Sequence, residues 1–168
     1  AKFSEYLFSS LTDSFIPAVS SDEFPLLAKV DSKSLVLTLS QSGETFDTIS
    51  ALKFAKSKGA MTAAVVNVMG SSISRLVDKV ILQGSGPEIC VISTKAAFAQ
   101  MIILTILALK LSLKKKTIKR REYDSSITAL RELPEVIQNI LNERSGFIHR
   151  IANNYSKVKN WLYLGRGI

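Results

Sequence analysis

Apolar residues along the chain occur in two patterns that alternate. Residues 35–39, 63–68 and 80–82 are short, nearly continuous apolar runs. Between and after them, residues 45–57 repeat apolar side chains every three to four positions, and residues 93–113 form one apolar stretch of helical length. Continuous apolar strands that alternate with helices are typical of a parallel sheet covered on both faces. We therefore expect an α/β protein, a three-layer α/β/α arrangement with a mostly parallel sheet.

The two ends of the chain differ from this middle part. Residues 3–11 carry apolar side chains at helical spacing, so the chain opens within a helix. Residues 124–142 predict an amphipathic helix that Pro134 could kink or divide, and residues 147–155 predict a further helix. Residues 161–164 read as a new strand with a Gly-Arg-Gly loop after it. This ending predicts the opening of a second α/β unit.

A loop of neutral hydrogen-bond donors lies where the first strand runs into a helix. Residues 40–45 read Ser-Gln-Ser-Gly-Glu-Thr, without Lys or Arg. The first N–H groups of a helix lack partners and carry a partial positive charge, which favours a phosphate at this point. Neutral donors suit a phosphorylated sugar better than a nucleoside triphosphate with its magnesium. The alternative is an ordinary turn in which Ser and Thr cap the helix, and Glu44 is expected to complement the helix dipole.

Composition narrows the class of protein. With 168 residues, 46% of them apolar, the chain is long enough for one well-buried domain and is not disordered. The single cysteine, Cys90, excludes an internal disulfide and, with no visible signal peptide, favours a reducing, cytoplasmic setting. Residues 96–109 are too few to span a bilayer and include Gln100 and Thr105, so a buried core helix is favoured over a membrane segment.

The net charge of +8 would allow an acidic partner, but the basic residues are not evenly spread. Seven of the Lys and Arg residues crowd into residues 110–121, at the end of a predicted helix, where cations are favoured. No aromatic residues are interleaved with them, as they are in many surfaces that bind nucleic acid. We therefore expect a solvated connection, with neither nucleic acid nor a membrane as partner.

Three motifs occur in order along the chain. They cover residues 37–45 (Leu-Thr-Leu-Ser-Gln-Ser-Gly-Glu-Thr), 67–72 (Asn-Val-Met-Gly-Ser-Ser) and 86–95 (Gly-Pro-Glu-Ile-Cys-Val-Ile-Ser-Thr-Lys). With them the chain resembles the sugar isomerase (SIS) domain family, and more narrowly the first of the two SIS domains in the glutamine–fructose-6-phosphate aminotransferases. The Leu-Gly-Arg-Gly of residues 164–167 resembles the first strand and loop of the second SIS domain in those enzymes.

The resemblance implies a substrate and the residues that hold it. Enzymes of this family convert fructose 6-phosphate to glucosamine 6-phosphate with ammonia released from glutamine. Two loops that precede helix N-termini would contact the sugar phosphate; for the second loop, packing and helix capping is an equal alternative. The implied substrate-binding residues are Ser40, Gln41, Ser42, Thr45, Val91 and Ser93.

The resemblance also implies that the chemistry lies outside this chain. The family's general base, Schiff-base lysine and ring-opening histidine would follow Ile168, and its glutaminase domain would precede Ala1. No catalytic residue, cofactor or metal is therefore assigned to the chain. The expected partners are fructose 6-phosphate or a related sugar phosphate, further copies of the chain in a homo-oligomer, the glutaminase domain and the second SIS domain.

Three segments are expected. Residues 1–122 would form an SIS core that lacks its first strand, so the SIS-domain fold is incomplete at the N-terminus. Residues 123–160 would be a helical segment that packs on the core or links from it, and residues 161–168 would start the second SIS domain. A missing strand leaves backbone groups of its neighbour unpaired. We hypothesise that residues 161–164 fill this gap beside residues 35–39.

Two classes of function stay open. The chain is either the ketose-binding part of an aminotransferase, inactive by itself, or a phosphosugar-sensing SIS module of a regulatory protein. The closing Leu-Gly-Arg-Gly favours the enzyme, because a sensor usually carries one SIS domain beside a DNA-binding helical domain.

Overall fold

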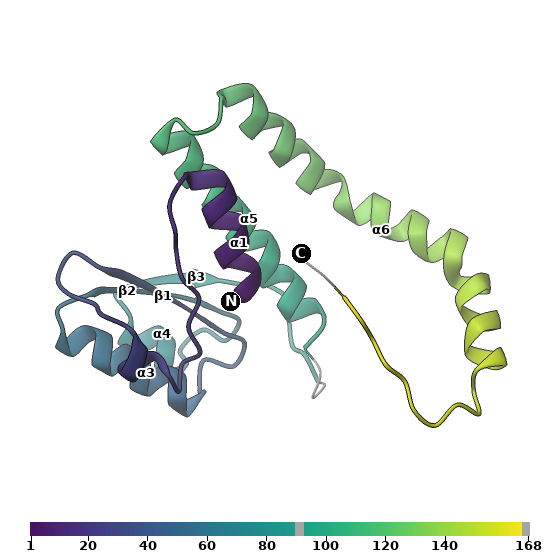
Figure 1. Cartoon of the computed structure of the whole chain (residues 1–168), viewed down its shortest axis with the longest axis horizontal. Helices are drawn as coiled ribbons and strands as arrows, with labels where there is room; N and C mark the ends of the chain where they lie inside the picture. The colour runs from purple at the N-terminus through teal and green to yellow at the C-terminus, as the bar shows by residue number, and fades with distance from the viewer. Residues whose placement is uncertain (90–92, 166–168) are drawn as a thin grey trace. The chain divides into compact units, whose positions relative to one another are not determined.

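The computed structural model describes residues 1–89 and 93–165 (Figure 1). The chain forms two compact units that divide between Thr117 and Ile118. Unit 1, the N-terminal one, contains the sheet and the helices that cover it. Unit 2 contains one long helix and the segment that follows it.

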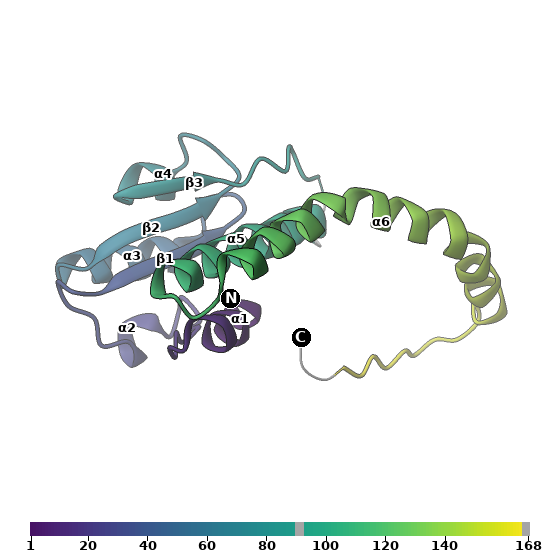
Figure 2. The same ribbon diagram turned by 90° about the horizontal axis from the view of Figure 1, so that it is seen from above.

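Unit 1 is built around a sheet of three parallel strands. β1 (Leu35–Ser40), β2 (Met61–Val66) and β3 (Lys79–Leu82) lie in the order β1-β2-β3, as Figure 2 shows from above. The last residues of the three strands lie side by side in register, so their carboxyl ends meet at one edge. Each apolar run thus contributes a strand, although β2 begins and ends two residues earlier than the predicted run of residues 63–68. The predicted parallel sheet is confirmed.

Helices α3 (Phe46–Ser57) and α4 (Ser72–Leu76) cover one face of this sheet. Side chains of a strand alternate between its two faces, and every second residue of β2 points toward these helices. α2 (Phe24–Leu27), a single turn before β1, packs against α3. The buried cluster on this face consists of Leu52, Ala64, Val66 and Ile73.

Helices α1 (Lys2–Thr12) and α5 (Lys95–Lys115) cover the opposite face. Their buried residues pack against the side chains of β1 that point away from α3. Helices on both faces of the sheet confirm the predicted three-layer α/β/α arrangement. The cluster on this face consists of Phe8, Leu104 and Ala108, with Leu37 and Leu39 of β1 packed against it.

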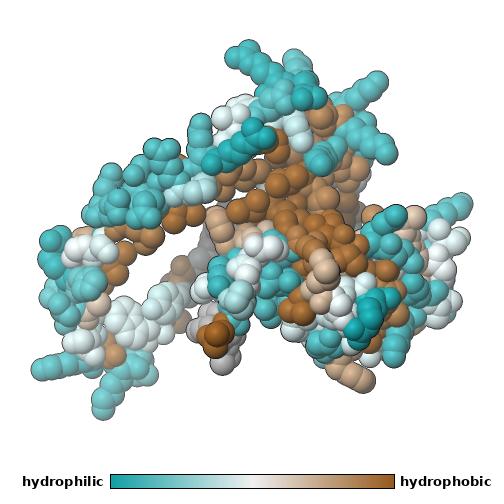
Figure 3. Space-filling model, turned by 180° about the vertical axis from the view of Figure 1, so that it is seen from behind, coloured by the Kyte–Doolittle hydropathy of each residue, from teal (hydrophilic) through white to brown (hydrophobic). Residues whose placement is uncertain are grey.

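By length and composition, α5 is long and apolar enough to cross a membrane. In the structure it packs against α1 and β1 and buries Leu104, Ala108 and Leu109 in unit 1. It also leaves Phe98 and Met101 exposed, and apolar side chains gather along this helix on the face seen in Figure 3. One side of the helix therefore packs in the core of unit 1, and another side remains an exposed apolar surface.

Unit 2 is dominated by α6 (Arg120–Asn154), one helix of 35 residues. The prediction of two separate helices is wrong, because Pro134 and Gly146 both lie inside the continuous helix. A proline removes one backbone hydrogen bond and a glycine costs about 1 kcal/mol relative to alanine, and neither loss ends this helix. The Lys119 N–H donates to the Glu122 carboxylate at 2.7 Å and fixes the start of α6.

The predicted strand at residues 161–164 is also wrong. This segment has no regular secondary structure, and β1 pairs only with β2 among residues 1–89 and 93–165. Trp161 instead packs against the rings of Tyr155 and Tyr163, with centroids 6.0 and 6.4 Å away. A strand needs a partner for its backbone groups, and local aromatic packing takes its place here. Residues 166–167 of the predicted loop lie outside the described residues.

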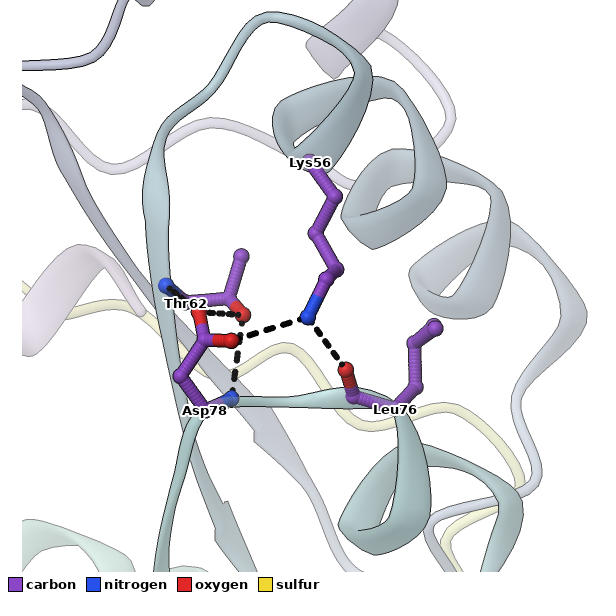
Figure 4. Close-up of polar contacts among 4 residues, drawn as sticks. All are labelled: Lys56, Thr62, Leu76 and Asp78. Carbon is purple, nitrogen blue, oxygen red and sulfur yellow. Dashed lines mark hydrogen bonds and ion pairs between the residues drawn. The ribbon is translucent and has the colours of Figure 1, made fainter.

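A polar cluster fastens the amino ends of β2 and β3 to α3 (Figure 4). The Asp78 carboxylate accepts hydrogen bonds from the Thr62 N–H at 2.8 Å and the Thr62 hydroxyl at 2.7 Å. Lys56 Nζ donates to Asp78 Oδ1 and to the Leu76 carbonyl, both at 2.9 Å. The hydrogen bonds from Lys56 and then from Thr62 hold the pKa of Asp78 well below its usual range. The carboxylate is therefore ionised, and both of its oxygens accept hydrogen bonds from the protein's own groups.

Candidate functional site

The loop predicted to hold a phosphate lies directly beyond β1. Ser40 is buried at the end of the strand, and its Oγ accepts a hydrogen bond from the Gly43 N–H at 3.0 Å. The Thr45 hydroxyl lies 3.2 Å from the same Ser40 Oγ. The structure thus brings the hydroxyls at the two ends of the loop together.

Thr45 is the N-cap residue of α3, but its side chain makes no capping hydrogen bond. Its hydroxyl is turned toward Ser40 instead. Within the described residues, no side chain accepts a hydrogen bond from the first-turn amides of α3, residues 46–48. Such amides carry a partial positive charge and need acceptors. The alternative of Thr45 as a side-chain cap is therefore not what the structure shows.

The middle of the loop is held by a hydrogen bond to the Ser42 hydroxyl and by a left-handed glycine. The Glu44 N–H donates to Ser42 Oγ at 3.2 Å, and Gly43 adopts a φ of +69°. A Cβ on Gly43 would overlap the Ser71 hydroxyl and lie 2.6 Å from the Ser71 Cβ. Only glycine fits here, because the backbone is left-handed and the turn after β2 lies against it.

Glu44 caps the start of α4, whereas the sequence predicted that it would complement the dipole of α3. Its carboxylate accepts a hydrogen bond from the Ser72 N–H at 2.8 Å, at the start of α4. The hydrogen bonds from Ser72, with the nearby Arg75, lower the pKa of Glu44. The one acidic group of the loop is therefore occupied elsewhere, and the rest of the loop offers neutral donors.

The second predicted segment begins α5. Val91 lies outside the described residues. Ser93 is exposed, and its hydroxyl donates to the Glu88 carboxylate at 2.9 Å. The other Glu88 oxygen accepts from the N–H groups of Thr94 and Lys95 at 2.9 and 3.1 Å. Desolvation opposes the ionised form of Glu88, but these hydrogen bonds outweigh it and lower its pKa.

The sequence motifs did not identify Glu88 as a residue of the site. It occupies the start of α5 with the protein's own carboxylate, so this helix N-terminus has an internal acceptor and that of α3 has none from its N-cap side chain. A carboxylate a few residues before a helix with an exposed Ser-Thr pair is a signal that could have found it.

Two other features of the described residues bear on where a ligand could bind. No group of three potential metal ligands occurs among the described residues. Two open hollows of about 450 and 390 Å³ lie near the amino ends of the strands, beside Ser34 and Asp78. Both are at the edge of the sheet opposite to the loop of residues 40–45.

The fold and the site define a class of protein. Residues 1–110 match the SIS domain family, and the chain belongs to that family. A relative from Methanococcus maripaludis named glutamine–fructose-6-phosphate aminotransferase [isomerizing] is 40% identical over 168 residues, 100% of this chain and 27% of that protein. One of the same name from Caldanaerobacter subterraneus subsp. tengcongensis is 43% identical over 139 residues, 83% of this chain and 23% of that protein. The chain spans about a quarter of the length of these relatives.

A solved structure shares the fold. The C-terminal domain of glucosamine-fructose-6-phosphate aminotransferase from Francisella tularensis superposes with a TM-score of 0.83 and 25% identity, over 92% of this chain and 44% of that one. The resemblance to SIS domains is thereby confirmed.

Proposed function

We propose that the chain is a phosphosugar-binding SIS domain of a glutamine–fructose-6-phosphate aminotransferase, and that it holds the phosphate of fructose 6-phosphate. The observation that carries this proposal is the unused N-terminus of α3. Thr45 turns its hydroxyl toward Ser40 and does not cap the helix, so among residues 1–89 and 93–165 the first-turn amides of α3 have no side-chain acceptor. A phosphate supplies the acceptor oxygens that this arrangement lacks. Gln41 and Ser42 complete the set of neutral donors.

The proposal assigns the sugar end of the ligand to the start of α5. Ser93 is exposed there and is oriented by its hydrogen bond to Glu88. An ionised carboxylate accepts hydrogen bonds from sugar hydroxyls but repels a second phosphate. The segment therefore suits a ligand with one phosphate and several hydroxyls, and Val91 belongs to the same proposed contact.

Catalysis is proposed to need parts of the protein beyond this segment. In the proposed loop the one ionisable group is Glu44, which is committed to Ser72. General acid–base catalysis needs a free titratable group within hydrogen-bond reach of the reacting carbon atoms. We therefore expect this chain alone to form no glucosamine 6-phosphate from fructose 6-phosphate and an ammonia source. Detectable product from the purified chain would contradict this assignment.

A homo-oligomer and a cytoplasmic setting belong to the same proposal. α6 buries none of its residues, and apolar side chains such as Ile140, Leu141 and Ile148 are exposed along it. Exposed apolar helix faces of this length favour association with a further protein surface. The names of the relatives favour the enzyme over a sensing module.

A titration with matched ligands tests the proposed site. We expect fructose 6-phosphate and glucose 6-phosphate to shift the backbone amide NMR signals of residues 40–48, and fructose without phosphate to leave them in place. Ser42→Ala should weaken fructose 6-phosphate binding about two- to tenfold, the cost of one hydrogen bond. Ser57→Ala, at the other end of α3, removes only a hydroxyl bonded to Phe54 O and is the control. Equal affinity of Ser42→Ala and the unaltered chain would remove Ser42 from the site.

A further inference from the structure

The first residue of the motif of residues 67–72, Asn67, has no assigned role, yet it joins three loops. Asn67 follows β2 directly, between the loops that follow β1 and β3. Its N–H donates to the Gln41 carbonyl at 3.1 Å. Its side-chain Oδ1 accepts from the Ser85 N–H at 3.1 Å, and its Nδ2 donates to the Gly86 carbonyl at 2.7 Å. One residue thus binds the phosphate loop on one side and the turn after β3 on the other.

The turn after β3 leads directly to the proposed sugar end of the site. Gly86 lies two residues before Glu88, and Glu88 holds the Ser93 hydroxyl and the first amides of α5. A continuous path therefore runs from Gln41 through Asn67 and Gly86 to Glu88. Both halves of the proposed site are attached to this path.

Turn formation alone does not explain an asparagine at position 67. Asparagine is often selected because it tolerates a positive φ, but among the described residues other than glycine only Asp13 and Lys116 have one. The Asn67 side chain uses both of its polar atoms on the turn after β3, one as a donor and one as an acceptor. Alanine offers neither atom, and serine is too short to reach both partners.

We propose that Asn67 is a positioning residue that fixes the spacing between the phosphate-holding loop, residues 40–45, and the sugar-side segment, residues 86–88 with Ser93. It thereby determines the preference for a sugar phosphate over phosphate alone. The inference rests on the proposed function. A ligand that engages both segments gains from their fixed spacing, because less freedom is lost on binding. A ligand that engages only the loop gains nothing from it.

The turn after β3 has a second support, so loss of the Asn67 side chain should loosen it without unfolding the chain. Gln83 is buried at the end of β3, and its Nε2 donates to the Ser85 hydroxyl at 2.8 Å. The Gln83 N–H also donates to the Val66 carbonyl at 2.8 Å and continues the sheet. The Asn67 N–H remains available to Gln41 in any variant except proline.

Neutral variants of the full 168-residue chain test the inference, because an aspartate would add a charge that repels both ligands. Asn67→Ala and Asn67→Ser are compared with the unaltered chain, with Asn160→Ala in the C-terminal segment as control. Fructose 6-phosphate and inorganic phosphate are titrated at equal ionic strength. We expect both Asn67 variants to bind fructose 6-phosphate about three- to tenfold more weakly. Inorganic phosphate should bind equally to all four proteins.

Other outcomes separate this inference from the proposed function. Equal weakening of both ligands, or a fall in melting temperature that abolishes both, would show a purely structural role and overturn the inference. Unchanged binding of fructose 6-phosphate would also overturn it. If the unaltered chain binds neither ligand, the proposed function fails, and the inference fails with it. Faster hydrogen exchange of the Ser85 amide in Asn67→Ala, with the Gln83 amide unchanged, is the expected structural signature.

Discussion

The two edges of the parallel sheet satisfy their polar groups in opposite ways. At the amino edge, the Asp78 carboxylate is paired with Lys56 and Thr62 of the same chain. At the carboxyl edge beyond β1, the Ser40 and Thr45 hydroxyls lie together, and the N-cap residue Thr45 makes no side-chain capping hydrogen bond to α3. An edge that completes its own hydrogen bonds serves stability, whereas one that leaves donors together beside a helix N-terminus suits a ligand.

The largest effect is expected at the contact that shapes the ligand edge. Gly43→Ala should lower the free energy of unfolding by about 2–4 kcal/mol, because it adds backbone strain and a clash with Ser71. Gly70→Ala is a matched control: Gly70 also has a positive φ, of 77°, but nothing lies within 4 Å of its added Cβ. Urea unfolding measures both. Equal losses in the two variants would mean that the Ser71 contact does not shape the loop.

A smaller loss is expected at the amino edge, with no effect on the ligand. Thr62 is fully buried, and Thr62→Val removes its hydroxyl from Asp78 while keeping its shape. The free energy of unfolding should fall by about 1–3 kcal/mol, and fructose 6-phosphate affinity should stay the same. Thr128→Val on α6, where the hydroxyl bonds only Asp124 O, is the control. A large loss of fructose 6-phosphate affinity in Thr62→Val would contradict the claim that the amino edge contributes to stability and not to ligand binding.

The pH dependence of stability should also report the amino edge. The folded chain holds the pKa of Asp78 below the ordinary value of 3.8, so the unfolded chain binds the proton more tightly. The stabilisation is fully present above that value and is lost as the pH falls below it. Thermal unfolding should therefore show a lower melting temperature for Asp78→Asn at neutral pH, and the difference should shrink in acid. A difference that grows as the pH falls would contradict the assigned ion pair.

The sequence was a good guide where a local pattern decides the structure. The apolar runs became β1, β2 and β3, and the Ser-Gln-Ser-Gly-Glu-Thr loop lies between a strand and a helix as expected. The sequence was a poor guide where the secondary structure of a segment depends on contacts with other segments. Residues 161–164 have strand-like composition but no regular secondary structure. Pro134 lies inside α6, because the loss of one backbone hydrogen bond did not end a helix of 35 residues.

Within the site, residues of one loop could be predicted and links between loops could not. Ser40 and Thr45 share a short segment, so the local motif identified both. Asn67 binds backbone groups of two other segments, the Gln41 carbonyl and the Gly86 carbonyl. The partner residues contribute only their backbone groups, so their side-chain identity does not reveal the contact. Parallel topology sets these distant loops side by side, and only the fold shows it.

The most direct test of the ligand edge is Thr45→Ala, measured for both stability and affinity. If Thr45 were a helix cap, alanine would cost about 0.5–2 kcal/mol of stability and leave ligand binding unchanged. Because its hydroxyl faces Ser40 and caps nothing, we expect the free energy of unfolding to stay within about 0.5 kcal/mol. Fructose 6-phosphate should bind about two- to tenfold more weakly. Lost stability with unchanged affinity would contradict the assignment of this loop as the phosphate site.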